Sequence, residues 1–198
     1  MTFRFAKRVS LLCCSLTLSL EAAPPSARPL AHASGGAGAA TLFHKLDPSV
    51  CGVDFVNPID TSHPMKRLYI GGFACGGVAI GDLDGDGKAD LYLTSGPRPN
   101  RLYRQFGTLK FEDVTAAAGV ASDANWSAGA TLVDVDADGD LDIYLCRYDA
   151  PNELFINEST PGKMKFTERA KEYGLAIQDA SLMASFCDYD NDGDLDCL

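Results

Sequence analysis

Aspartates are concentrated in three short segments whose spacing suits metal binding. Each segment fits the nine-residue pattern Asp-x-Asp-x-Asp-Gly-x-x-Asp, at residues 82–90, 134–142 and 188–196. These segments hold 14 of the 21 aspartates of the chain, which contains only 6 glutamates. Because aspartate favours turns and supplies hard oxygen ligands, this bias predicts metal-binding loops and not a generic acidic surface.

The spacing inside each loop favours calcium. Carboxylates at positions 1, 3 and 5 of a tight loop can converge on one point, and the carboxylate at position 9 closes the shell. Glycine at position 6 permits the left-handed turn that brings the chain back. Position 7 is expected to offer only its backbone carbonyl, because in the first loop it is Lys88, whose ammonium group cannot bind a metal. Magnesium is disfavoured, since an all-protein oxygen cage suits calcium better.

The sequence therefore predicts up to three Ca²⁺ ions, one in each loop. The expected ligand residues are Asp82, Asp84, Asp86, Lys88 and Asp90 in the first loop, Asp134, Asp136, Asp138, Asp140 and Asp142 in the second, and Asp188, Asp190, Asp192, Asp194 and Asp196 in the third.

The loops belong to a longer repeat. Residues 78–82 match residues 130–134 and then residues 184–188, so that the period is close to 50 residues, and the second copy carries extra residues around 159–163. Such a period is typical of repeat architectures such as propellers. Short apolar runs bounded by turn residues predict four strands in the first period, at 77–82, 90–95, 100–105 and 109–114.

This layout predicts an all-β fold made of β-propeller-type blades of four antiparallel strands. The chain would hold two complete blades and the first hairpin of a third, so the ring is incomplete and its sheet edges are exposed. The loops would connect strands within hairpins. An EF-hand is excluded because position 12 is Leu93 or Leu145 where an EF-hand needs glutamate. Minor helices are expected at 115–118 and 167–173.

The N-terminal part has the composition of an export signal and a linker. Basic residues precede a short apolar stretch in residues 1–22, which reads as a signal peptide. Residues 23–41 form an Ala/Pro/Gly linker, and residues 42–76 are a lead-in segment. The repeats follow at 77–198, divided at about 77–128, 129–182 and 183–198. The expected location is secreted, periplasmic or cell-surface, with no membrane span.

The remaining residues give few indications of catalysis. The formal net charge of −10 makes nucleic acid a poor partner. His44 and His63 belong to no nucleophile motif and are expected to be surface or capping residues. Trp126 is expected to pack between blades. A local basic cluster is expected to be a solvated strand edge; it comprises Arg98, Arg101 and Arg104.

Five cysteines follow the predicted signal peptide. Export permits disulfides, and Cys51 and Cys75 in the lead-in segment are a possible pair. The other three fall in predicted strands, where a small buried hydrophobic role is favoured; they are Cys146, Cys187 and Cys197.

Several segments resemble a known family. The string from Gly76 through the first acidic loop to Leu93 resembles the FG-GAP or VCBS repeat of integrin-α-like propellers. Residues 111–120 and 152–157 are similar to the more specific ASPIC/UnbV family, which includes cartilage acidic protein, and residues 51–55 resemble its lead-in. The resemblance implies a ring of about seven blades, so the chain is interpreted as an N-terminal fragment or a truncated product.

The pattern and the resemblance together predict an exported calcium-binding propeller module for extracellular protein or glycan binding or adhesion, and not an enzyme. In this interpretation calcium stabilises the loops between strands. Two alternatives stay open: the propeller domain of a secreted polysaccharide lyase or hydrolase, and a calcium-stabilised domain with no ligand of its own.

Overall fold

A computed structural model describes residues 45–70, 76–122 and 126–198. The predicted signal peptide, the linker and Cys75 lie outside the described residues. Residues Lys45–Leu198 form one compact unit. No helix in the described ranges has the length and apolar character needed to cross a membrane. The predicted division into lead-in and three repeats remains a prediction.

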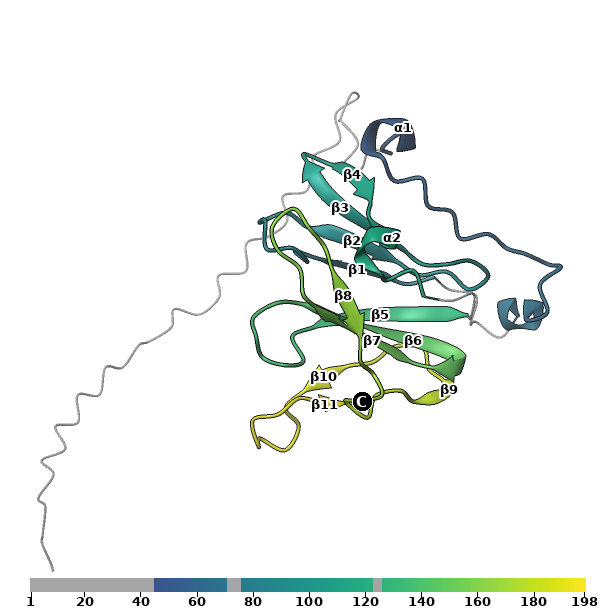
Figure 1. The fold of residues 1–198 in the computed structure, drawn as a ribbon. Helices are drawn as coiled ribbons and strands as arrows, with labels where there is room; N and C mark the ends of the chain where they lie inside the picture. The colour runs from purple at the N-terminus through teal and green to yellow at the C-terminus, as the bar shows by residue number, and fades with distance from the viewer. Residues whose placement is uncertain (1–44, 71–75, 123–125) are drawn as a thin grey trace, which may run out of the picture. The chain divides into compact units, whose positions relative to one another are not determined.

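The first repeat folds into a four-stranded antiparallel sheet, which Figure 1 shows in teal. Its strands follow one another in chain order and are β1 (Val78–Gly81), β2 (Asp90–Leu93), β3 (Arg101–Gly107) and β4 (Lys110–Asp113). Every end of these four strands lies within two residues of its predicted position, and the first acidic loop connects β1 to β2. The short helix α2 (Thr115–Ala118) follows β4, as predicted.

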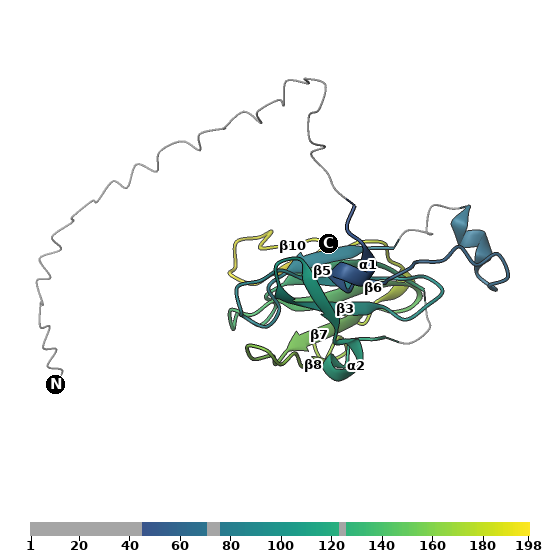
Figure 2. The ribbon, with the colours of Figure 1, turned by 90° about the horizontal axis from the view of Figure 1, so that it is seen from above.

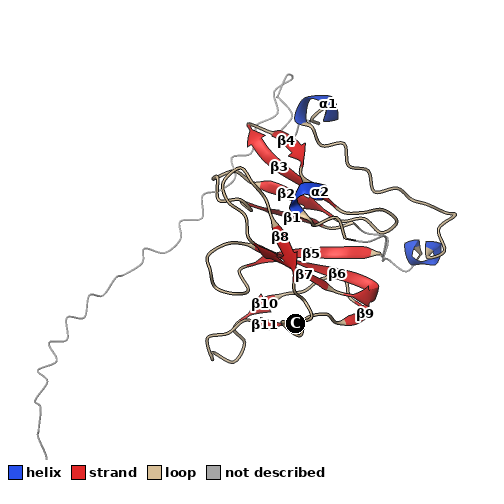
Figure 3. Ribbon diagram, in the orientation of Figure 1, coloured by secondary structure: helices blue, strands red, loops and turns tan. Residues whose placement is uncertain are grey.

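The second repeat forms a sheet with the same order of strands. Its members are β5 (Ser127–Val133), β6 (Asp142–Pro151), β7 (Glu153–Asn157) and β8 (Phe166–Glu168). The ten-residue β6 extends beyond β7, and its far end pairs with an additional strand, β9 (Gln178–Ala180). The third repeat contributes the hairpin of β10 (Phe186–Cys187) and β11 (Asp196–Cys197). Figure 3 shows that strands dominate the regular structure, which confirms the all-β prediction.

Successive sheets pack face to face. Alternate side chains of β6 are buried on opposite faces: Ile143 and Leu145 join a cluster with Tyr92 and Leu102 of the first sheet. Tyr144 and Cys146 instead join a cluster with Phe186 of the third repeat. Burial on both faces explains why residues 143–146 of β6 are continuously apolar. Helix α2 lies next to β8 in both Figure 1 and Figure 2, and its Ala118 shares the first cluster with Phe166.

The lead-in segment packs against the first sheet. Its two short helices are α1 (Pro48–Cys51) and a 3-10 helix at Lys66–Tyr69. Asp54 accepts a hydrogen bond from the Tyr103 hydroxyl at 2.8 Å. His63 and Tyr69 make edge contacts with Trp126, with ring centroids 5.5 and 5.3 Å apart. Trp126 is 1% exposed, so it is buried as expected, although its ring partners come from the lead-in.

Three predictions from the sequence are wrong. The predicted helix at 167–173 is instead the end of β8 followed by turns, because residues 166–168 pair with β7. Cys187 is exposed and not a buried hydrophobic residue, since its hairpin is covered on only one side, whereas Cys146 is buried. Arg104 is not at a solvated edge: its side chain is only 15% exposed, against 46% for Arg101, because acidic partners surround it.

Candidate metal centres

The three acidic loops fold in the same way. In each, the backbone N–H at position 2 donates to the carboxylate at position 9 over 2.9 Å; the pairs are Leu83 with Asp90, Val135 with Asp142 and Tyr189 with Asp196. The carboxylate at position 1 accepts the N–H groups of positions 5 and 6 in every loop. The aspartates therefore shape the loops by themselves, as local side-chain-to-backbone bonding predicts.

Each loop takes a left-handed backbone at two positions. The glycine at position 6 has a φ of 83° to 97° in the three loops, as predicted. Position 4 is also left-handed, with φ of 71° at Gly85, 59° at Ala137 and 60° at Asn191. This second position was not predicted from the sequence, because glycine, alanine and asparagine share no pattern there. Glycine and asparagine tolerate the conformation well, whereas alanine is strained in it.

Ala137→Gly is therefore expected to stabilise the protein by about 0.5–1 kcal/mol, because glycine relieves the strained φ of the second loop. Thermal unfolding of the metal-free chain measures the gain. The control is Ala116→Gly in α2, where glycine weakens a helix and should cost about 0.5–1 kcal/mol. A loss of stability in Ala137→Gly equal to that of the control would contradict the assignment of strain.

The loops bring carboxylates close together. In the first loop the side chains at positions 1, 3 and 5 have oxygen atoms within 4.8 Å of one another, whereas in the other two loops positions 1, 3 and 9 do. The three groups are Asp82, Asp84 and Asp86; Asp134, Asp136 and Asp142; and Asp188, Asp190 and Asp196. The remaining predicted ligand side chains lie outside these groups, among them those at position 7. Each of the three clusters thus offers three carboxylates, a set of oxygen donors that fits one hard divalent cation.

In the first two loops the aspartate at position 9 is almost completely buried, whereas its counterpart in the third loop, Asp196, is exposed. Asp90 is 0% exposed and Asp142 is 1% exposed, and each also accepts a backbone N–H from the third strand of its sheet, Gln105 or Asn157. Burial raises the pKa of Asp90 to about 6, although two backbone N–H groups counteract it, and the nearby Asp84 and Asp86 raise it further. Burial likewise raises the pKa of Asp142. An adjacent cation would favour the ionised form of both.

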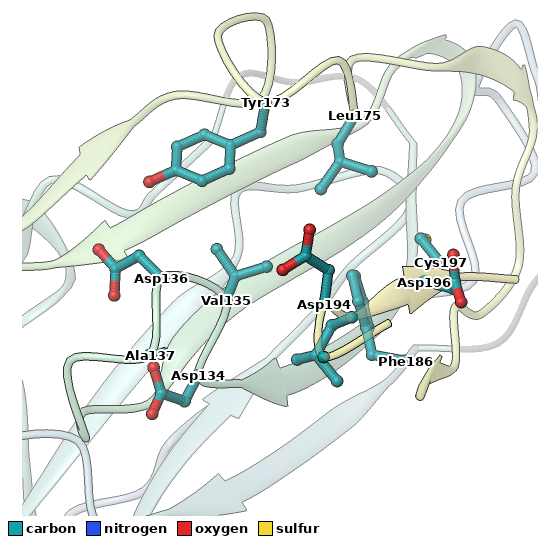
Figure 4. Close-up of a pocket in the computed structure, with 12 residues that line it drawn as sticks. Asp134, Val135, Asp136, Ala137, Tyr173, Leu175, Phe186, Asp194, Asp196 and Cys197 are labelled. Carbon is teal, nitrogen blue, oxygen red and sulfur yellow. The ribbon is translucent and has the colours of Figure 1, made fainter. Parts of the chain in front are cut away.

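The second and third loops share a pocket of about 590 Å³. Figure 4 shows carboxylates of both loops around it, with Tyr173 and Leu175 from the segment after β8. Asp194, at position 7 of the third loop, contributes its side chain to this pocket and is not part of the third cluster. Negative charge is therefore concentrated between these two loops.

The first two sheets share a buried polar network, which lies in each sheet at the end away from the acidic loop. Asn100 donates to the hydroxyl groups of Tyr92 and Ser127, both at 3.1 Å. Asn152 makes the equivalent bonds to Tyr144 at 2.9 Å and Ser181 at 3.0 Å. No role was predicted for these asparagines from the sequence, although both follow a proline at equivalent places in the repeat. The network fixes the end of each sheet away from its acidic loop.

This architecture of acidic hairpin loops in four-stranded sheets agrees with the family comparison. A family model described as an FG-GAP-like repeat matches residues 82–145 and 134–198, which together are more than half of the chain. The chain belongs to the FG-GAP-like repeat family, as the resemblance predicted.

Among curated proteins, the chain is similar to cartilage acidic protein 1. It is 29% identical to the protein from Homo sapiens and 28% identical to the one from Xenopus tropicalis, in each case over 121 residues. The aligned region covers 61% of this chain but only 18% of each relative. The chain therefore spans less than two thirds of the length of these relatives.

Proposed function

We propose that the chain is an exported calcium-binding module of the propeller type, used for binding extracellular protein or glycan. Calcium would be held in the acidic loops and would stabilise the connections between strands. The observation that supports this most strongly is the threefold recurrence of one hydrogen-bonded loop with clustered carboxylate oxygens. The family match and the similarity to cartilage acidic protein 1 support the extracellular setting.

The chemistry of the donor set favours calcium over other ions. Every clustered group is a carboxylate, and the described residues place no histidine or cysteine among them. Oxygen-only ligands suit calcium, magnesium or manganese and not zinc or copper. In this proposal Asp134, Asp136 and Asp142 would hold the ion of the second loop. Asp188, Asp190 and Asp196 would hold that of the third, and carbonyl groups at position 7 would complete each shell.

Calcium would act on this protein through electrostatics. Without a cation, clustered carboxylates repel one another and favour opening of the loop. A divalent ion bound only by the folded loop stabilises the native state by mass action. A module of this kind needs no catalytic residue, and His63 makes structural contacts: its Nδ1 accepts a hydrogen bond from the Met65 amide at 3.1 Å, and its ring packs edge-on against Trp126. We therefore propose a binding protein and not an enzyme.

Asp136→Ala tests the ligand role directly. Asp136 is exposed, so its removal should change the metal-free stability by less than about 0.5 kcal/mol. Extracellular calcium modules bind at about 10⁻⁴–10⁻³ M, so about 10 mM calcium should stabilise the wild-type second loop by about 1.4–2.7 kcal/mol. Asp136→Ala should lose that gain.

The measurement is the melting temperature in chelator and in calcium, for the variant and the wild type. The control is Asp179→Ala, an exposed aspartate of β9 outside the loops, which should keep the full calcium gain. Equal calcium gains in Asp136→Ala and in the control would contradict a role for Asp136 in binding.

A further inference from the structure

The first loop differs from the other two because a cation of the protein itself reaches it. Arg104 extends from β3, where its Nε donates to Asp84 at 2.6 Å and its Nη2 donates to Asp86 at 2.9 Å. Its Nη1 reaches Glu112 of β4 at 3.2 Å. Lys88 of the loop itself adds a second contact to Asp86, at 2.9 Å. Two of the three clustered carboxylates are thus already paired with positive charge.

The other loops contain no such cation. At the offset of 52 residues between the repeats, the position of Arg104 is taken by Ile156, a buried apolar residue. Across the described part of the chain, no lysine or arginine forms an ion pair with an acidic residue of the second or third loop. The positions that cluster also differ, since the first loop gathers positions 1, 3 and 5 and the others gather 1, 3 and 9.

The second sheet also closes over the first loop. The β7–β8 hairpin, which holds the extra residues of the second repeat, places the Gly162 N–H on the same oxygen of Asp84 that accepts from Arg104, at 2.9 Å. Asn157 at the base of this hairpin donates to the carbonyl of Leu83 at 2.9 Å. Asp84 is consequently only 3% exposed. The first loop is therefore both neutralised and covered by groups of this chain.

We propose that Arg104 serves as a built-in cation of the first loop. It holds this loop and the junction between the first two sheets without calcium, and it weakens calcium binding there relative to the second and third loops. The physical reason is competition: the guanidinium occupies the carboxylate oxygens that an ion would need, and its positive charge repels a divalent cation. This inference deepens, and in its calcium part rests on, the proposed calcium-binding function.

Arg104→Gln in the full chain tests this inference. In chelator the variant should melt lower than the wild type, by about 5 °C or more, because it leaves covered carboxylates without their cation. On addition of calcium it should gain more than the wild type gains, and calorimetric titration should show one additional site or an affinity about tenfold higher at one site. Arg101→Gln is the matched control, since Arg101 lies on the same strand and pairs with the half-exposed Asp113 at 3.5 Å.

The outcomes separate this inference from the proposed function. If the wild type and Arg104→Gln gain equally from calcium, the inference is overturned and calcium binding stands. If neither responds to calcium, both are overturned. If only Arg104→Gln responds, competition between Arg104 and calcium in the first loop is supported, whereas the ranking of the first loop below the other two and calcium binding by those two loops are overturned. Should Arg104→Gln be unfolded in chelator, refolding on addition of calcium supports the inference, and failure to refold overturns it.

Discussion

Replacing Asp142 by alanine is expected to lower the free energy of unfolding by about 2–4 kcal/mol even in the absence of calcium. Its two carboxylate oxygens accept the backbone N–H groups of Val135 at 2.9 Å and Asn157 at 2.7 Å. Because Asp142 is 1% exposed, alanine would leave these donors without an acceptor beside a small cavity. For a chain of this size the melting temperature in chelator should fall by roughly 5–15 °C.

The comparison with Asp136→Ala makes this prediction specific. Both residues belong to the second cluster, but Asp136 is exposed whereas Asp142 joins the loop to β7 through Asn157. Loss of Asp136 should therefore be visible only with calcium present, and loss of Asp142 in both conditions. Thermal unfolding followed by circular dichroism measures both. An unchanged melting temperature of metal-free Asp142→Ala would contradict the structural role assigned to the ninth position.

Gly96→Ala is expected to cost about 1–3 kcal/mol or more, because the new methyl group would overlap the Trp126 ring. A Cβ at position 96 would lie 2.2 Å from Cε2 of Trp126 and 2.5 Å from its Cζ2. The ring cannot easily move away, since His63 and Tyr69 pack against it edge-on. Trp126 is the only tryptophan of the chain, so its fluorescence reports the disturbance directly.

The matched control is Gly107→Ala at the end of β3. A Cβ at position 107 would approach Lys110 to 3.7 Å, an ordinary van der Waals distance, so this variant should change stability by no more than about 0.5 kcal/mol. Gly96→Ala should also shift the emission of Trp126 to longer wavelength as the ring gains contact with water. Native-like emission together with native-like stability would contradict the packing of the lead-in segment on this ring.

The features that the sequence predicted well are governed by local interactions. The aspartate and glycine spacing sets the loop conformation through bonds within nine residues, such as Leu83 to Asp90. The period of about 50 residues places the same four strands in the first two sheets, and apolar runs between turn residues mark their positions. For these reasons the strands of the blades and the position of the loops in hairpins could be anticipated, whereas the choice of clustered positions, 1, 3 and 5 in the first loop and 1, 3 and 9 in the others, could not.

The features that the sequence did not predict depend on contacts between distant residues. Arg104 was grouped with Arg101 by proximity in the chain, yet the loop 20 residues before it and the hairpin around Gly162 decide its environment. Similarly, residues 167–173 have helical composition, but pairing of Phe166 with β7 extends the strand instead. One signal could have revealed Arg104: it is a charged residue where the next repeat has Ile156.

The most direct test of the proposed function is a calorimetric titration of the full chain with calcium, with magnesium as the competing ion. We expect at least two calcium-selective sites with dissociation constants of about 10⁻⁴–10⁻³ M. One of these sites should be lost in Asp136→Ala and another in Asp190→Ala. A folded chain that binds no calcium, or whose sites survive both substitutions, would contradict the assignment of the acidic loops as calcium sites.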